Sequence, residues 1–408
     1  MKKIVHIAGV DMYSSHDSGN WIIFNAMRDL PYDSHHILGL GRGRENPDTS
    51  YYPISVEGSQ VGVEDSFDSA DVVILYDSLL YPETVKAIYD KHKCPIVFVG
   101  MVNDHFTGGC CYVFGCDKFK SSCGACPQLA PNGHMISHKN MSEDFTPSSD
   151  DKDKSFQLLQ RKKEAWNDIP IIGAPVSNYS LKLFKESSLF KDKRCECIPI
   201  PFDIPVFEGS REEARIALGY PEEVKDKFVI LWGTTNPDGP RKGRKYADEA
   251  FNHLYKQMKE KGYDTDDVVV LSAGPAPSVP FSQTQPFRWM PKGYVPTREH
   301  LSYVYRSVNV GLQTTIEDAG PMMSVECLSN KTPLVSFDRC VSADVIKDGE
   351  SGYLVDTYDS VGLGEALLKV YESKVDMGIN ADKYVKEFND KEKVLQKWQS
   401  LIEEVTNG

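Results

Sequence analysis

Two carboxylates at a fixed spacing are the clearest chemical feature of this chain. Asp318 and Glu326 lie eight positions apart, on either side of a Gly-Pro pair, and an apolar segment with strand character (308–315) runs into them. Carboxylate oxygens accept hydrogen bonds from hydroxyls, so one acid on each side of a phosphate site can hold a sugar and a ribose. The spacing indicates a site for a nucleotide-linked sugar if the residues between the two acids bind phosphate.

The Gly-Pro pair predicts such a phosphate site. Pro321 suits the first position of a helix over 321–329, because its fixed φ is helical and its missing N–H costs nothing there. The backbone N–H groups at this helix start have no intrahelical partner, and Gly320 carries no side chain that would keep an anion away. Gly320, Pro321 and Met322 are therefore predicted to contact the phosphates, with Glu326 further into the helix.

Two basic residues lie on a second loop that can reach the same ligand. Arg241 and Lys242 belong to a Gly/Pro-rich segment that follows an expected strand (228–233) and precedes a long expected helix. In parallel α/β sheets, ligands bind at the ends of such strands. A cation pair there can neutralise a diphosphate that gains charge as its bond to a sugar breaks. Two exposed basic residues are the alternative interpretation, and the acid pair favours the functional one.

Cysteines cluster in one short segment of the first half. Five of the ten lie between positions 110 and 126. Cys123 and Cys126 form a C-x2-C pair, and Cys110 with Cys116 can supply a second pair across a short loop. Four thiolates make a closed tetrahedral zinc site, which is structural because no position is left for water. Cys111 is a substitute ligand, and reduced thiols or disulfides are the alternatives to zinc.

Length, composition and charge describe a large globular enzyme. A chain of 408 residues exceeds what one core supports, so two domains are expected. The formal net charge of −13 argues against a nucleic-acid partner. No apolar run approaches the ~20 residues of a spanning helix. The apolar start is interrupted by His6 and Asp11, so it predicts a buried strand rather than a signal peptide, and a cytoplasmic location.

Short apolar runs alternate with amphipathic segments throughout the chain. This rhythm predicts an α/β fold with parallel sheets and helices on both faces. The expected strands are 4–10, 71–76, 95–101, 170–176, 196–199, 228–233, 268–273, 308–314 and 333–337. The expected helices are 21–30, 82–92, 156–167, 180–186, 245–261, 299–307, 321–329, 360–372 and 382–405.

The rhythm restarts after a Pro-punctuated stretch at 201–207, which predicts two Rossmann-like domains. The predicted N-terminal domain is 1–204 and contains the Cys-rich loop 108–129. The predicted nucleotide-sugar-binding domain is 205–381, and a C-terminal segment, 382–408, follows it. The dinucleotide fingerprint G-x-G-x-x-G does not follow the first strand, so a hydride-transfer enzyme is disfavoured.

Three separated motifs give the chain a resemblance to a known family. The Thr-Gly-Gly-Cys loop at 106–129, the Arg-Lys-Gly triplet at 241–243 and the acidic segment 317–326 resemble motifs of the retaining glycosyltransferases of family four. The Cys-rich loop resembles a bacterial polysaccharide-biosynthesis branch of that family. The resemblance implies the GT-B fold, in which two Rossmann-like domains face a deep cleft and a C-terminal helix returns to the first domain.

The resemblance also implies a reaction and roles for the site residues. The enzyme would move a sugar from a nucleotide-diphosphate donor to a glycan, glycolipid or glycoconjugate acceptor, with retained anomeric configuration. Lys242, helped by Arg241, would bind the diphosphate, and Glu326 would contact the ribose. Asp318 stands where the family has a Glu near the donor sugar, and Gly320 and the amides after it would face the sugar and phosphates. No catalytic metal is implied, and a lipid-linked acceptor would add a peripheral contact with the inner face of a membrane.

The chain departs from the family pattern at two positions. Many members carry a His at the position of Met101, and His105 comes four residues too late to replace it. An Arg that usually precedes the phosphate-binding Lys is replaced by Pro237. Two other functions therefore stay open: a nucleotide-sugar epimerase of the same fold, and a non-catalytic nucleotide-sugar-binding homologue.

Overall fold

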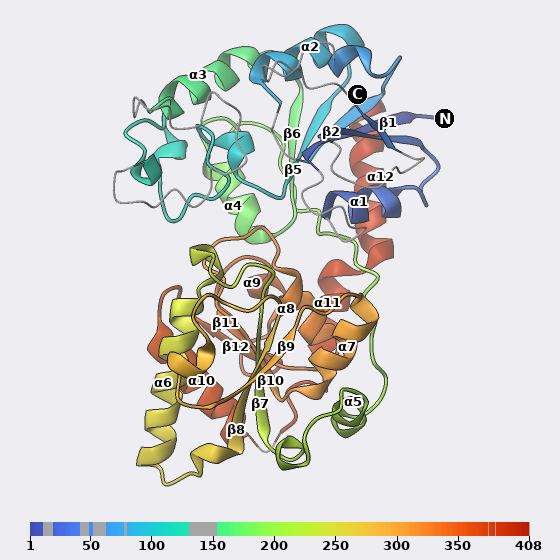
Figure 1. The fold of residues 1–408 in the computed structure, drawn as a ribbon. Coiled ribbons are helices and arrows are strands. Elements are labelled where there is room, and N and C mark those ends of the chain that lie inside the picture. Colours follow the sequence, from blue (N-terminus) through green and yellow to red (C-terminus); the bar gives the residue numbers. More distant parts are fainter. Residues whose placement is uncertain are drawn as a thin grey trace. The chain divides into compact units, whose positions relative to one another are not determined.

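The computed structural model describes residues 1–10, 19–40, 49–51, 63–76, 80–129, 153–373, 375–379 and 381–407. It contains two compact units (Figure 1), one formed by Met1–Phe202 with Asn389–Gly408 and the other by Asp203–Phe388. Each unit is built around a six-stranded sheet whose described strand pairs are all parallel. The predicted α/β class with two Rossmann-like parallel-sheet domains is confirmed.

The sheet of the first unit has the order β3-β2-β1-β4-β5-β6. Three neighbouring strands, β4 to β6, are short apolar runs that are fully buried, as parallel strands covered by helices require. The strands are β1 (Lys3–Val10), β2 (Asp33–Leu40), β3 (Thr49–Tyr51), β4 (Val72–Leu75), β5 (Ile96–Gly100) and β6 (Ile171–Pro175). The helices that follow them are α1 (Gly19–Met27), α2 (Pro82–His92), α3 (Ser155–Ala165) and α4 (Asn178–Glu186).

The sheet of the second unit has the order β12-β11-β10-β7-β8-β9. Read from β9, this is the same order as in the first unit, with the reversal between β7 and β10. The strands are β7 (Phe228–Gly233), β8 (Val268–Ala273), β9 (Arg288–Gly293), β10 (Val310–Gln313), β11 (Leu334–Phe337) and β12 (Gly352–Val355). The helices are α5 (Arg211–Ala217), α6 (Arg244–Glu260), α7 (Arg298–Ser307), α8 (Met322–Ser329), α9 (Ser342–Val345) and α10 (Ser360–Glu372).

Most expected elements form, and most of the missed strands lie at sheet edges. The expected strand at 196–199 is wrong, because no strand is present there, although the backbone N–H groups of Glu196 and Ile198 donate to the carbonyls of Gly173 and Pro175 in β6. The sequence did not indicate β2, β3, β9 or β12. Both β9 and β3 are edge strands, and β9 contains a proline and is largely exposed, so it lacks the apolar run of a central strand. The expected loop at 132–154 lies almost wholly outside the described residues.

The expected single helix at 382–405 is two helices, α11 (Ala381–Asn389) and α12 (Lys391–Asn407). Asp390 separates them, and its carboxylate accepts the backbone N–H of Lys393 at 3.0 Å, which is the contact of a helix N-cap. The division between the units falls at Phe388, so α11 belongs largely to the second unit and α12 to the first. Trp398 is fully buried in α12 and anchors that helix. Within the described residues, no helix combines the length and the apolar character needed to cross a bilayer.

Candidate functional site

The loops that carry the predicted basic and acidic residues meet in the second unit. β7 and β10 are neighbours in the sheet, and the strand order reverses between them. Ligands of open α/β sheets bind outside the carboxyl ends of the strands at such a reversal. The loop after β7 contains Arg241 and Lys242, and the loop after β10 contains Asp318. The strand order therefore brings the basic loop after β7 and the acidic loop after β10 together at the position where open α/β sheets bind ligands.

Hydrogen bonds fix the loop after β7 to the segment after β10. The backbone N–H of Ile316 donates to the carbonyl of Arg241, and the hydroxyl of Thr314 donates to the carbonyl of Lys242, both at 2.9 Å. Gly243 has φ +70, and a Cβ atom there would lie 1.8 Å from the carbonyl oxygen of Thr314. Only glycine fits this close approach. In the Arg-Lys-Gly triplet, the glycine is therefore required for steric reasons, and the two residues before it supply the positive charge.

Asp318 forms ion pairs with both basic residues. Its Oδ2 atom lies 2.8 Å from Lys242 Nζ and also accepts a hydrogen bond from the Arg241 guanidinium. The three side chains are 15–21% exposed, so water screens the group only partly. Burial by itself would raise the pKa of Asp318, but the charges of Lys242 and Arg241 outweigh burial and hold the pKa well below its usual range. Asp318 is therefore ionised at neutral pH, and the group carries a net charge of about +1.

The neighbouring acid, Glu317, has a different partner and was not singled out in the sequence. It is 1% exposed, and its carboxylate lies 2.7 Å from Arg339 in the segment after β11. A buried pair of this kind costs several kcal/mol to break, because one charge would stay buried without its partner. Glu317 and Arg339 thus hold the loop that presents Asp318.

Glu326 lies in α8 and is 7% exposed. Its Oε2 atom accepts a hydrogen bond of 2.6 Å from the hydroxyl of Tyr305, which belongs to α7. Burial, and then the charge of Glu326, raise the pKa of Tyr305 well above its usual value, so Tyr305 stays a hydrogen-bond donor. Tyr305 orients the carboxylate of Glu326, and no signal in the sequence marked it.

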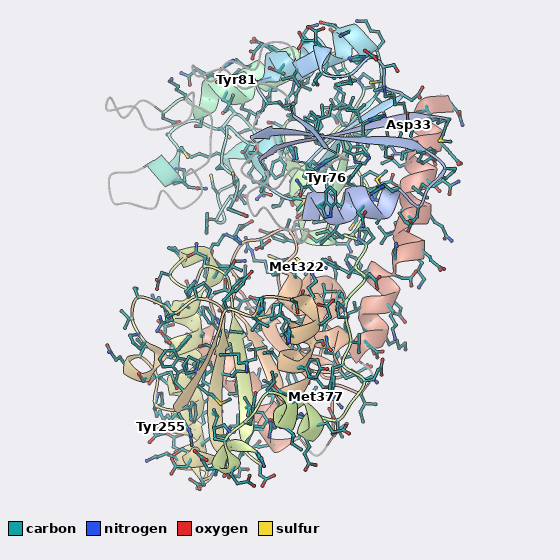
Figure 2. All side chains as sticks on the ribbon, turned by 45° about the vertical axis from the view of Figure 1, so that its right-hand side comes forward. Asp33, Tyr76, Tyr81, Tyr255, Met322 and Met377 are labelled. Atoms are coloured by element: carbon teal, nitrogen blue, oxygen red, sulfur yellow. The ribbon has the colours of Figure 1, made fainter. Side chains whose placement is uncertain are left out.

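The start of α8 differs from the prediction by one residue. Pro321 is the N-cap in an extended conformation, with φ −61 and ψ 114, and the helix begins at Met322. The backbone N–H of Gly320 donates to Asp318 Oδ1 at 3.3 Å, so the amide predicted to be open for phosphate is engaged by the acid two residues before it. The sulfur of Met322, a residue labelled in Figure 2, lies 3.8 Å from the Arg298 guanidinium. A cation from α7 thus adjoins the start of α8.

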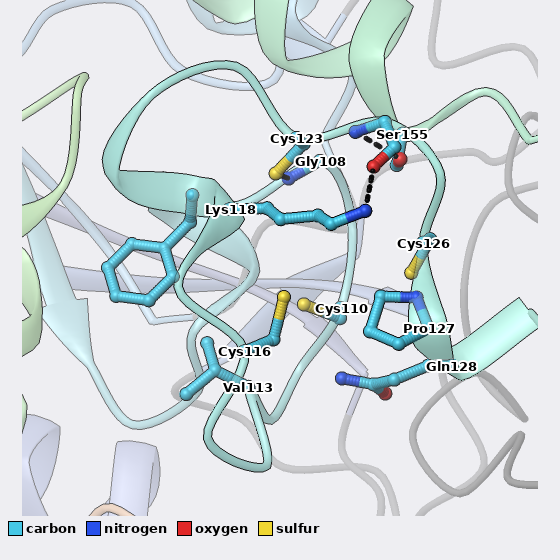
Figure 3. A pocket seen from close by; sticks show the side chains of 12 residues that line it. Gly108, Cys110, Val113, Cys116, Lys118, Cys123, Cys126, Pro127, Gln128 and Ser155 are labelled. Atoms are coloured by element: carbon cyan, nitrogen blue, oxygen red, sulfur yellow. Dashed lines mark hydrogen bonds between the residues drawn. The ribbon is translucent and has the colours of Figure 1, made fainter.

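The four predicted zinc ligands line one small cavity in the first unit. Cys110, Cys116, Cys123 and Cys126 surround a space of about 20 Å³ (Figure 3). Among the described residues, no disulfide forms, and no three Cys, His, Asp or Glu side chains converge closely enough to hold a metal ion as they stand. The zinc site therefore stays a prediction.

The two positions that depart from the family pattern have ordinary packing roles. A Cβ atom on Gly19 would lie 2.3 Å from the terminal methyl of Met101, so Met101 covers the start of α1. His105 is fully buried, hydrogen bonded through Nε2 to the carbonyl of Val99 at 3.0 Å, and burial lowers its pKa. His105 is therefore a neutral core residue and does not replace the histidine of the family. Pro237 is buried in the loop after β7.

Residues 290–389 match the family model "Glycosyl transferases group 1". The matched segment contains Asp318 and Glu326 and ends before α12, and it does not reach Arg241, Lys242 or the Cys-rich loop. No curated protein matches the chain.

Solved structures of similar fold cover nearly the whole chain. A sucrose-phosphate synthase from Thermosynechococcus elongatus is 12% identical with a TM-score of 0.65, and the match covers 99% of each chain. Anabaena HepE, in complex with UDP and glucose, is 12% identical with a TM-score of 0.65 over 99% of this chain and 100% of that one. The pneumococcal O-GlcNAc transferase GtfA, in complex with UDP and GlcNAc, is 10% identical with a TM-score of 0.64 over 100% and 99%. At such identities the likeness establishes the GT-B fold alone.

Proposed function

We propose that this protein is a retaining glycosyltransferase that moves a sugar from a nucleotide-diphosphate donor to a glycan, glycolipid or glycoconjugate acceptor. The observation that carries the proposal is the group formed by Arg241, Lys242 and Asp318 at the strand-order reversal of the second sheet. The match of residues 290–389 to glycosyl transferases group 1 supports the reaction class. The retained anomeric configuration is inferred from the resemblance of the motif around Asp318 and Glu326 to the retaining glycosyltransferases of family four.

The cation pair suits a diphosphate leaving group. Arg241 and Lys242 are fixed by the contacts of their backbone carbonyls with Ile316 and Thr314. When the bond between sugar and diphosphate breaks, negative charge grows on the phosphate oxygens. Preorganised cations stabilise that charge more in the transition state than in the ground state.

Asp318 holds the two cations and is proposed to change partner when donor binds. Its carboxylate pairs with Lys242 at 2.8 Å and with Arg241. Phosphate oxygens compete for the same two cations, and the released carboxylate can accept a hydrogen bond from a sugar hydroxyl. After the exchange the cations are paired with phosphate and the carboxylate is hydrogen bonded to the sugar, which limits the desolvation cost.

Glu326 is proposed to bind the ribose of the donor. Tyr305 donates to one of its oxygens, and a carboxylate is the kind of acceptor that binds the hydroxyls of a diol. The UDP in the HepE and GtfA complexes supports a nucleotide diphosphate as the ligand of this fold and makes UDP sugars the first donors to test. A lipid-linked acceptor would place the enzyme at a membrane surface.

A thermal-shift panel of nucleoside diphosphates and their sugars tests the proposal. At 100 times Kd, a true ligand stabilises the folded state by ~2.7 kcal/mol, which ranks the bases clearly. The best donor is then incubated alone and with candidate acceptors, and the anomeric configuration of the product is read by proton NMR. An epimer formed without acceptor would assign an epimerase, and tight binding without turnover would assign a non-catalytic protein. An inverted product would remove retention from the proposal.

A further inference from the structure

The Cys-rich loop of the first unit is compact although it contains little regular structure. Residues 101–129 form no strand and only the 3-10 helices Asp104–Phe106, Lys118–Lys120 and Pro127–Leu129. Phe106, Val113 and Phe119 are nevertheless 0–2% exposed and belong to the core of the unit. Backbone hydrogen bonds, such as that from Asn103 N–H to the carbonyl of Cys111 at 2.8 Å, hold parts of the loop. A long connection without strands is stabilised further by any additional constraint that keeps these side chains in the core.

Four cysteines surround the cavity inside this loop. Cys110 and Cys116 approach it from one part of the loop, and Cys123 and Cys126 approach it from the next turn (Figure 3). Cys111 is adjacent in sequence but does not line the cavity. The space of about 20 Å³ suits one water-sized occupant, and the lining supplies four thiols to it.

Residues of the C-x2-C turn adopt left-handed backbone conformations. Binding of one ligand by both cysteines of the turn would explain why these conformations are kept. Cys123, Gly124 and Ala125 have φ values of +53, +90 and +43, which two non-glycine residues rarely adopt in one turn. Such conformations cost about 1–3 kcal/mol each and persist where the surroundings impose them. The backbone N–H of Gly108 donates to Cys123 Sγ at 3.3 Å, so the loop backbone orients this sulfur.

Two lysines lie where they can balance a negative cluster. Lys162 is 3% exposed and donates to the carbonyls of Asp104 and Thr107, the latter at 3.1 Å. Lys118 lines the cavity, and its ammonium donates to the carbonyl of Gly124 at 3.0 Å. A divalent ion bound by four thiolates carries a net charge of −2, and a nearby buried cation lowers the cost of holding that charge in the core.

We propose that Cys110, Cys116, Cys123 and Cys126 bind one zinc ion that holds the Cys-rich loop in its folded conformation. Zinc binding would require the four sulfur atoms to move to ~2.3 Å from the ion, closer together than they lie among the described residues, and the thiols would release their protons to solvent. Four thiolates leave no open position, so the ion is structural. The zinc site is independent of the donor site in the second unit and does not rest on the proposed reaction.

Cysteine alkylation of the full chain, read by peptide mass spectrometry, distinguishes the three states of the thiols. With zinc bound, the four cavity cysteines are protected until a chelator is added, and Cys111 reacts throughout. Protection that is lost only after a reductant would assign disulfides, and rapid labelling of all four without a chelator would assign free thiols. Either outcome overturns the zinc site.

Elemental analysis of the tag-free protein is expected to give about one zinc per chain. Cys123→Ser and Cys126→Ser are expected to lower the zinc content at least tenfold, and the matched control Cys111→Ser is expected to keep it. Equal zinc in all three variants, or no zinc in folded wild-type protein, would refute the proposal.

Cobalt substitution provides a test that needs no variant. Wild-type protein stripped of metal and reloaded with Co²⁺ is expected to show intense visible bands and sulfur-to-metal charge transfer, as four thiolates in a tetrahedron produce. A weak octahedral spectrum would contradict the site. The donor thermal shift is measured on the same samples, so failure of the zinc site and failure of the donor site are told apart.

Discussion

At the scale of single residues, the donor site is an electrostatic arrangement with one acid and two bases. Asp318 is ionised because Lys242 and Arg241 offset its burial. Lys242 and Arg241 are proposed to contact the diphosphate of the donor, Asp318 the sugar and Glu326 the ribose. Substitutions should therefore affect kcat and KM differently.

Lys242→Ala is expected to lower kcat by roughly 10²–10³, the scale for losing one preorganised group that stabilises transition-state charge. Steady-state kinetics with the donor identified by thermal shift provides the measurement. Lys245→Ala is a suitable control, because Lys245 is 76% exposed in the next helix and its contacts, with Glu249 at 3.8 Å and the Tyr246 ring at 5.9 Å, lie within that helix. A Lys242→Ala enzyme with normal kcat and KM would mean that the diphosphate binds elsewhere.

Glu326→Gln and Tyr305→Phe are expected to raise the donor KM with little change in kcat. A ribose contact is equally strong in the ground and transition states, and Tyr305 acts only through the orientation of Glu326. The effect of Tyr305→Phe should be the smaller and should disappear in the Glu326→Gln background, which a double-mutant cycle measures. Additive effects in that cycle would show that Tyr305 does not act through Glu326.

Asp318→Asn is expected to strengthen the binding of free nucleoside diphosphate and to slow the turnover of the donor. Free nucleoside diphosphate should bind roughly five-fold more tightly, because an ion pair worth about 1 kcal/mol no longer has to be broken. The value of kcat/KM should fall by roughly 10–100-fold, since the sugar loses a contact that orients it. Calorimetric titration and kinetics on the same preparation give both numbers. Weaker diphosphate binding would contradict the exchange of partners.

At the scale of elements, the site depends on close contact between the loops after β7 and β10. Gly243 permits that contact, because its missing side chain leaves room for the carbonyl of Thr314. The contact fixes Arg241 and Lys242 through backbone atoms, so their positions do not depend on their own side-chain packing.

Gly243→Ala is expected to displace the basic loop and to lower kcat/KM by roughly 10²-fold, the effect of a misplacement of about 1 Å. Gly262→Ala is a matched control, because Gly262 has φ +75 but nothing lies within 4 Å of an added Cβ. Both variants should lose about 1–2 kcal/mol of stability to the left-handed backbone, and only Gly243→Ala should also lose activity. Equal activity in the two variants would contradict the role of the loop contact.

At the scale of the whole molecule, the two units differ in their response to acid. The first unit buries His6 and His36 next to each other on β1 and β2, at 0% and 2% exposure, with His6 Nδ1 at 2.7 Å from the hydroxyl of Tyr76. Burial, followed by the nearby histidines, lowers the pKa of His6 well below its usual value. Burial lowers the pKa of His36 to about 4.

The first unit is therefore expected to lose stability between pH 6.5 and pH 4. A histidine in the unfolded chain takes up a proton below pH ~6.5, whereas the buried histidine stays neutral until the pH reaches its lowered pKa. The free energy of unfolding therefore decreases as the pH is lowered. His36 alone contributes a loss of about 2–3 kcal/mol at pH 4.5. Hydrogen exchange of β1 and β2 peptides measures the effect, with β7 and β8 peptides as the internal control. Unchanged protection of β1 and β2 at pH 4.5 would refute it.

The sequence determined the alternation of strands and helices and the places where the motifs follow a strand. β7, β8, α2 and α10 could be predicted to the residue, because a buried apolar run and its helix signals are local properties of the chain. Edge strands such as β9 could not be predicted in this way. An edge strand pairs on one side only, so it tolerates polar residues and proline and lacks a continuous apolar run. The break at Asp390 was likewise hidden in a continuous apolar stripe, because an N-cap is made by one side chain.

Only the tertiary structure decided which side chains are partners. Asp318 pairs with Lys242 across 76 positions, Glu317 with Arg339 across 22, and Tyr305 with Glu326 across 21. The sequence supplied the charges, but the strength of each pair depends on distance and burial, which arise when β7, β10 and β11 are placed side by side in the sheet. The amino-acid sequence specifies the residue types and their local spacing, whereas the distances between remote segments are defined only after the core has formed.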